Sequence, residues 1–573
     1  MDDLAAAPTP GSGLPDALPS APVRRRRRGL RIALGGLAAL VIVGVPGGLA
    51  LYSHLASGTG DVVDRMVPND ADVYATLYLD PSLSQKLNLQ GLFGHFPALK
   101  SAGDLQSHID QGMDTALKPE GLSFKNDVRP WLGTQVALAM RLGDGIPTAV
   151  LIASKDDGAA AATLARIRTT DSGHGDSWTE HAHNGVTVSV GTPRGTGGTP
   201  IAYAYVDHTA VVGNSAAMIE SVIDTDQGKR APLRTSAAYT TTMKRLPTDR
   251  VAAAWARGSG ITGAMRQAVA GSGFGDASIL KAFDQGAGVF QSAGIAVTAE
   301  KAGLAADVAV VTDPSKLPPA ERAALLQTSG APNPTLDWIP SDSAGFLAVG
   351  GLHDSLQSLV QGMGAGAAAT GMDFITPLKS FGLTNPGGVL SHLTGNLALE
   401  VRDAGGSSIP SGALLAGVDN AAAVRSFLDQ LVAGFATFAP THSESYRGAT
   451  ITSLAIPGLS DAGVDPAYTV VDGMAVIGST PAEVRAVLDA HASGSRATAT
   501  PAFAAGGQWS NAEPVIFLDL DRIRTAVVGA LPGDLKQQYD RDLSGDLSHL
   551  HGLRITSTGG GDQVVGRIFL SAG

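Results

Sequence analysis

DHTAVVGN at residues 207–214 and DGMAVIGS at residues 472–479 are two copies of the stretch that decides the fold. Both copies start at a two-residue turn and lead into a segment of helical character, residues 215–224 and 480–489. Asp-Gly is a preferred hairpin turn, so each copy predicts two antiparallel strands followed by a helix. Because the match holds without a gap, we expect the chain to contain one module twice.

The likeness extends to both sides of that stretch. A Pro turn feeding an apolar strand occurs as MVPNDA at residues 66–71 and as WIPSDS at residues 338–343. Later in each copy a strand ends at an acid or amide, Asp156-Asp157 or Asp419-Asn420, which is expected to cap the next helix. The predicted fold class is α+β, with two tandem duplicated modules, each a mainly antiparallel sheet with helices on one face.

An apolar run before the first module predicts a membrane span. Residues 32–51 carry no charge and follow six arginines, Arg24–Arg28 and Arg31. About 20 apolar residues in a helix cross the hydrocarbon core, and flanking arginines stay on the cytoplasmic side. A cleaved secretory signal is the competing interpretation, disfavoured by the length of the run and by the absence of a small-x-small exit sequence. The prediction is a single-pass cell-membrane protein with a cytoplasmic N-terminus and an extracytoplasmic remainder from about residue 53.

These features divide the chain into segments. The predicted segments are a disordered cytoplasmic tail with the arginine cluster (1–28), a transmembrane helix (29–52), a spacer (53–65), exported module one (66–313), a linking helix and break (314–336), and exported module two (337–573).

Composition narrows the classes of partner and chemistry. The 573 residues include no cysteine, which excludes disulfides, thiol catalysis and cysteine metal sites. The net charge is −11, and because residues 1–53 are basic, the exported part is more acidic still. An acidic balance disfavours nucleic acid and anionic polymers as general partners.

A family resemblance rests on particular motifs. They are the entry VPNDADVY at residues 67–74 with Asp80-Pro81 after its strand, the PWLG turn at residues 130–133, and the segment from Ala202 to Gly213. In these the chain resembles a bacterial family of membrane-anchored exported proteins, domain of unknown function 3352. The resemblance implies no catalytic residues. The second copy departs from it, with Gly350-Gly351 in place of the Asp-Pro.

The best metal candidate is a tract of acids and histidines. It contains Asp171, His174, Asp176, Glu180, His181 and His183. His-x-His on a strand puts both imidazoles on one face, where they could hold a divalent cation. The favoured interpretation is a polar hairpin, because the second copy has Ser443-Glu444-Ser445-Tyr446 there.

Other candidates have simpler explanations. Asn214-Ser215 stands where a nucleophile would, but Ser479-Thr480 replaces it in the second copy and helix capping explains both. The glycine loop at residues 362–366 follows no strand, so phosphate binding is not expected. Trp131 is expected to anchor the module edge. Asp519, Asp521, Asp540, Asp542 and Asp546 do not have calcium-loop spacing and are expected to form a solvated face.

The sequence therefore assigns no catalytic, cofactor-binding or metal-binding residue and predicts no cofactor. We expect a non-catalytic binding or scaffold protein of the bacterial envelope that contacts another envelope protein or an apolar ligand. The alternative is an extracytoplasmic hydrolase acting on wall or lipid material, whose acids and histidines meet only in three dimensions.

Overall fold

The structure, a computed structural model, covers most of the region predicted to be exported. It describes residues 61–96, 110–115, 117, 121–143, 145–173, 175–194, 200–271, 288–317, 333–351, 388–402, 410–435, 439–507, 514–560 and 563–573. The predicted tail, membrane span and most of the spacer lie outside these residues, as do residues 318–332 of the linking segment and the glycine loop at 362–366. Within the described ranges, no helix is long and apolar enough to cross a membrane.

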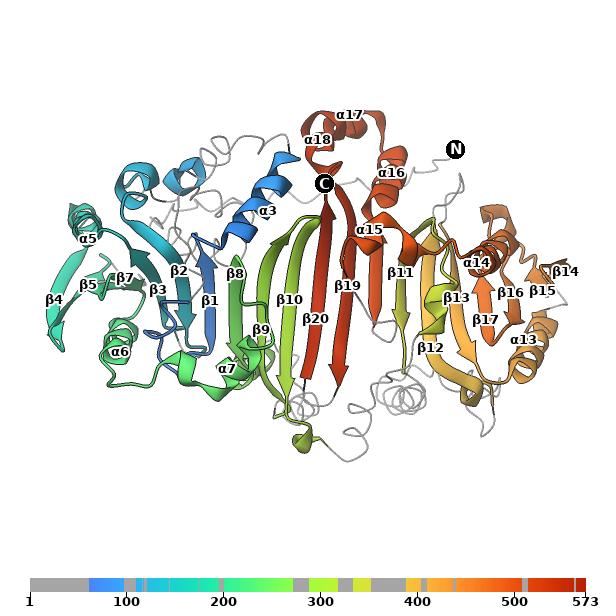
Figure 1. Ribbon diagram of the computed structural model, residues 1–573, viewed down its shortest axis with the longest axis horizontal. Helices are drawn as coiled ribbons and strands as arrows, with labels where there is room; N and C mark the ends of the chain where they lie inside the picture. The colour runs from blue at the N-terminus through green and yellow to red at the C-terminus, as the bar shows by residue number, and fades with distance from the viewer. Residues whose placement is uncertain are drawn as a thin grey trace, which may run out of the picture.

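The described strands form one antiparallel sheet of 20 strands that runs across the whole molecule (Figure 1). From one edge to the middle, neighbouring strands are β4 (Ser177–His183), β5 (Val186–Thr192), β6 (Ile201–Val206), β7 (Thr209–Gly213), β3 (Thr148–Ser154), β2 (Leu132–Met140), β1 (Val73–Tyr78), β8 (Ala252–Arg257), β9 (Phe290–Glu300) and β10 (Gly303–Thr312). We call β1–β10, with their connecting segments, the first half.

The remaining ten strands form the second half. From the middle outward they are β20 (Gln563–Ala572), β19 (Leu550–Gly560), β18 (Val515–Asp519), β11 (Ser343–Val349), β12 (Leu393–Arg402), β13 (Ser411–Val418), β17 (Met474–Gly478), β16 (Ala467–Val471), β15 (Ala449–Leu454) and β14 (Thr441–Tyr446). The two halves have the same strand order when each is counted from its outer edge to the junction. Each strand of the first half therefore corresponds to the strand of the second half whose number is ten higher, for example β2 to β12.

The two halves join edge to edge through β10 and β20, which lie side by side at the centre of Figure 1. Asp307 is the fifth residue of β10, Arg567 is the fifth residue of β20, and the two are directly opposite in the ladder. The ladder is centred on this equivalent pair, and residues before it on one strand face residues after it on the other, as around a two-fold axis.

Helices cover both faces of the first half, so the prediction of helices on one face is wrong. Along β2, Val136 and Leu138 belong to one core cluster, whereas Ala137 and Ala139 belong to a second cluster on the opposite face. Because successive side chains of these strands are both apolar, each face requires its own cover. The first cluster is covered by α3 (Leu83–Gly94) and α5 (Asp157–Gly173), and the second by α6 (Ala216–Asp226) and α7 (Ala237–Met243).

The second half repeats this arrangement in part. Helices α14 (Pro481–Ser493) and α15 (Pro501–Ala504) cover one face, and α13 (Ala421–Phe435) covers the outer end of the other. The other helices are α8 (Gly258–Gly271), α16 (Leu520–Ala530), α17 (Gly533–Asp542) and α18 (Ser544–Leu547). Short 3₁₀ or π turns occupy Phe124–Val128, Leu233–Thr235, Pro314–Lys316, Pro334–Asp337, Val389–His392, Ser460–Ala462 and Ala497–Ala499.

Local signals in the repeated stretch behave as predicted, with one exception. The turns Asp207-His208 and Asp472-Gly473 have positive φ at both residues, the conformation of a two-residue type I′ hairpin. Asp156 and Asn420 accept the amide hydrogens of Ala159 and Ala423 and so cap their helices. Thr480 caps α14, but Ser215 makes no side-chain cap bond to α6.

The folded region begins before Met66, inside the predicted spacer. The Asp61 carboxylate accepts hydrogen bonds from Tyr74 and Gln135, at 2.8 and 2.6 Å, and Val63 packs in the core. Burial and the nearby Asp61 charge raise the pKa of Asp64 to about 7. These contacts attach the last residues of the predicted spacer to the sheet.

Candidate functional site

A line of partly exposed aliphatic side chains crosses one face of the second half, and we call it the apolar row. Seven residues on seven neighbouring strands lie opposite one another in the ladder. Six of them are 37–51% exposed and Ile555 is half-buried. In order the row consists of Ile568, Ile555, Ile516, Leu347, Leu399, Leu414 and Ile477.

The surroundings of the row are uncharged. On each strand, the positions two residues before and after the row are apolar, glycine or serine, for example Leu397 and Val401 beside Leu399. The row ends at Ile477, where its cross-strand neighbour Tyr468 is buried in the cluster under α13. Only an apolar occupant suits such a surface, because it offers no group that pairs with a charge or a phosphate.

Strand β12 has its side chains in an unusual orientation. Alternation along Leu397–Arg402 would normally put the leucines in the core and the charged residues in water. Here Glu400 is completely buried on the face covered by α14, and Leu399 is 51% exposed on the other face. The exposed leucine face of β12 therefore has the composition of a covered face.

The first half shows how the same face can be covered. The positions equivalent to the outer four residues of the row, Leu347 to Ile477, are Ala75, Leu138, Val150 and Val212, and all four are buried. The positions equivalent to Ile516, Ile555 and Ile568 are Ala254, Ile295 and Val308, which are half-buried. Leu89 and Phe93 of α3 and Leu164 of α5 belong to the same core cluster. In the second half α13 corresponds to α5, and no described residue takes the place of α3.

The predicted metal candidates form a structural clamp instead. His181 and His183 do lie on one face of β4, but each faces a carboxylate of α6, with Nε2 2.8 Å from Glu220 Oε1 and 2.7 Å from Asp224 Oδ1. Glu180 pairs with Arg168, and Asp176 accepts the amide hydrogen of Arg194. His174 lies outside the described residues, and nowhere in the described part do three or more histidines or acids form a group that could hold a metal ion.

The second half has the same clamp with different chemistry. Strand β14 is held to α14 by a 2.6 Å ion pair between Glu444 and Arg485, so the acid lies on the strand and the base on the helix. Asp489 accepts from the Tyr446 hydroxyl at 2.9 Å and pairs with Arg447. Because the position is kept while the residues change, its role is to fasten each outer hairpin to its helix.

The remaining sequence candidates also have local partners. Trp131 is buried, and its Nε1 donates to Asp127 O and to Thr163 Oγ1 of α5. Asp519 caps α16 by accepting from Arg522 N at 3.0 Å. Asp521 lies 2.9 Å from His551, and a comparable pair joins Asp157 and His208 on an exposed surface, where the pKa of His208 is raised by the Asp157 hydrogen bond.

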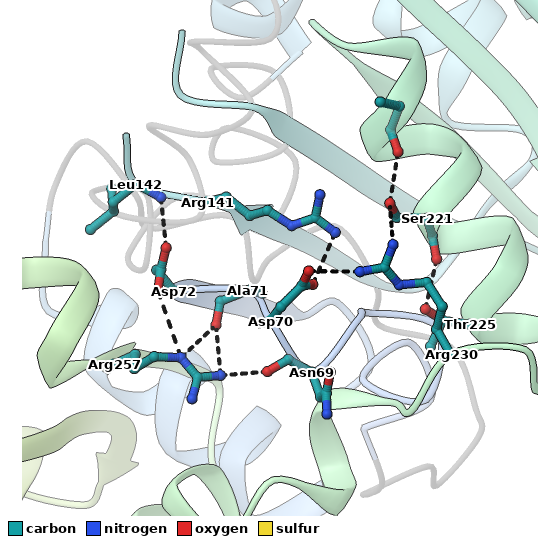
Figure 2. Close-up of polar contacts among 11 residues, drawn as sticks. Asn69, Asp70, Ala71, Asp72, Arg141, Leu142, Ser221, Thr225, Arg230 and Arg257 are labelled. Atoms are coloured by element: carbon teal, nitrogen blue, oxygen red, sulfur yellow. Dashed lines mark hydrogen bonds and ion pairs between the residues drawn. The ribbon is translucent and has the colours of Figure 1, made fainter. Parts of the chain in front are cut away.

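Three arginines hold the entry turn of the first half, as Figure 2 shows. Arg141 and Arg230 bind the Asp70 carboxylate at 2.9 and 2.7 Å, and Arg257 binds the backbone oxygens of Asn69 and Ala71. An open cavity of about 440 Å³ lies nearby, lined by Leu142, Gly143, Ser259, Gly260, Gly263, Ala264, Arg266 and Gln267. The described residues of its lining include no carboxylate or histidine that could act as an acid–base pair.

Comparisons with known proteins identify a family and no function. A family model described as a protein of unknown function (DUF3352) matches residues 33–401, more than half of the chain. No curated protein matches. Three crystal structures of TP0453, forms III, I and IV, are 12%, 10% and 12% identical, with TM-scores of 0.23, 0.22 and 0.22. The matches cover 44% of this chain and 78–80% of those chains, and at these TM-scores they carry no argument about the fold.

Proposed function

This chain belongs to the DUF3352 family of proteins of unknown function, and from that premise we propose that it is a membrane-anchored, non-catalytic binding protein of the bacterial envelope. The apolar row is its docking surface, and its partner is an amphipathic helix of another envelope protein. The anchor at residues 29–52 and an extracytoplasmic folded region are part of the proposal. We also propose that the two halves arose by duplication of one module.

The exposure of the row carries this proposal. Contiguous apolar surface of this kind, with uncharged surroundings, is typical of interaction sites. A helix is the favoured occupant because helices α3 and α5 cover four of the seven equivalent positions of the first half.

The dimensions of the row fit the same occupant. Seven neighbouring strands span about 29 Å at a strand spacing of about 4.8 Å. A helix of about 20 residues has the same length.

Site-specific photocrosslinking of the full-length chain in its native membrane tests the proposal. A photoreactive amino acid replaces Leu399 in the row, and the control places it at Val527, which is similarly exposed on α16. We expect Leu399 to capture one protein through a peptide with apolar residues at helical spacing, and Val527 not to capture it. A Leu414→Asp substitution on the neighbouring strand, directly opposite Leu399, should abolish the capture, because it places a charge inside the apolar contact.

The identity of the crosslinked peptide distinguishes the alternatives. A crosslink to residues 352–387 of the same chain would overturn the proposal, since the chain would then cover its own row. A crosslink to a second copy would replace the partner with a homodimer, and a lipid adduct would replace it with a lipid. Capture that survives Leu414→Asp would show that the row is not the docking surface.

A further inference from the structure

Two glutamates meet inside the core of the second half. Glu400 on β12 and Glu483 in the first turn of α14 are 0% and 1% exposed. Ser343 Oγ donates to Glu400 Oε2 at 3.1 Å, and Arg402 Nε lies 3.2 Å from Glu483 Oε2. Among the described residues, none donates a hydrogen bond to Glu400 Oε1 or to either carboxylate oxygen of Glu483. A single proton satisfies two of these oxygens, because a protonated carboxyl group donates to its neighbour.

The charges around the pair do not balance two carboxylates. Arg402 is shared with Asp342, whose Oδ1 lies 3.2 Å from Nη1. The residues opposite Glu400 on the adjacent strands are Phe346 and Ala413, which are apolar. The nearby turn Pro334–Asp337 contributes Asp337, which is already paired with Arg496.

One proton between the carboxyls is also what their environment favours. Burial, then the Glu483 charge and a hydrogen bond with that residue, raise the pKa of Glu400 from 4.5 to about 9, against the opposing effects of Ser343 and Arg402. Two like charges in a shared low-dielectric site do not both ionise readily.

The first half has no such pair at the same positions. Ala139 is equivalent to Glu400, because it pairs with Tyr74 as Glu400 pairs with Phe346. Met218 is equivalent to Glu483, because each is the third residue of its helix, α6 or α14. Both Ala139 and Met218 are completely buried. The neighbouring arginine–aspartate ion pair is present in both halves, as Arg141 with Asp70 and as Arg402 with Asp342.

We infer that Glu400 and Glu483 form a buried proton-binding site that holds α14 against β12, so that the second half loosens when the proton leaves. In the unfolded chain the Glu400 carboxyl ionises near its ordinary pKa of 4.5, whereas in the folded protein it retains its proton to higher pH. The stability contributed by the pair is therefore fully present below about pH 4.5 and is lost as the pH rises toward 9. For one proton, the equilibrium constant for opening rises about tenfold per pH unit in that window.

Hydrogen exchange of the full-length chain in detergent, measured from pH 5 to 9, tests the inference. Each variant is compared with wild type at the same pH, so the intrinsic exchange rate cancels. Glu400→Gln keeps the shape and needs no proton, and Glu400→Ala with Glu483→Met installs the residues of the first half. We expect wild-type peptides from β12 and α14 to lose protection relative to both variants by about tenfold per pH unit. Peptides from β2 and α6 serve as the internal control.

Several outcomes would overturn the inference. One is a constant ratio between wild type and variants across the pH range. Another is an equal loss of protection in the β2 and α6 peptides, because a general effect of pH would then explain the data. If Glu400→Gln fails to fold, the double variant still decides the question, since it contains neither carboxyl.

Discussion

The two halves of this sheet share one strand order and use equivalent positions differently. In the first half the face containing Leu138 is buried under α3 and α5, whereas in the second half the equivalent Leu399 is 51% exposed. On the opposite face, Ala139 and Met218 of the first half correspond to Glu400 and Glu483 of the second. The comparison teaches that the two halves share one backbone topology but differ in side-chain chemistry, and both of our proposals rest on positions where they differ.

Substitution of matched leucines should give the largest difference between the halves. Leu138→Ala removes buried methyl groups and is expected to cost about 2–5 kcal/mol of unfolding free energy. Leu399→Ala removes groups already in water and should cost less than about 1 kcal/mol. Urea denaturation of the full-length chain followed by tryptophan fluorescence measures both. Equal costs would mean that the row is covered in the free protein, and the contrast between the halves would disappear.

Substitutions at the junction should have intermediate effects. Arg567 pairs with Glu300 and lies 3.8 Å from the buried Asp307, so Arg567→Met leaves two acids without this partner and should cost about 1–2 kcal/mol. Asp307→Asn should change stability by less than about 0.5 kcal/mol, because burial already raises the pKa of Asp307 and asparagine needs no counter-charge.

The pH dependence at the junction provides a control. The raised pKa of Asp307 means that its stabilising contribution is lost as the pH rises through the folded value, and Asp307→Asn should remove that part of the pH dependence. Denaturation midpoints of wild type and Asp307→Asn, measured at several pH values, check this. A parallel pH dependence in the two proteins would contradict it.

The hairpin clamps should show the smallest effects. Asp224→Asn and Asp489→Asn remove exposed or half-buried partners and should each cost less than about 1 kcal/mol. The effect in the second half should weaken more in high salt, because Arg447 is always charged. Hydrogen exchange of β4–β5 and β14–β15 at low and high salt measures this. An equal salt response in the two hairpins would show that both clamps act through the same kind of ion pair.

The sequence by itself determined the repeated elements and their turns. Asp207-His208 and Asp472-Gly473 specify hairpins locally, and Asp156 and Asn420 cap helices within their own turn, so both follow from short-range chemistry. Family membership followed from such motifs as well. In β12 apolar residues alternate with charged residues from Leu399 to Arg402, but nothing local says which of its two faces is covered.

Only the tertiary structure decided which of these positions meet. Glu400 and Glu483 are 83 residues apart, and the seven residues of the apolar row come from strands spread between Leu347 and Ile568. Strand order and register bring them together, and a register shift of one residue would exchange the leucine face of β12 with the glutamate face. Sequence patterns record the period of a strand but not its neighbours, and for this reason the apolar row and the buried glutamate pair appear only when the sheet is assembled.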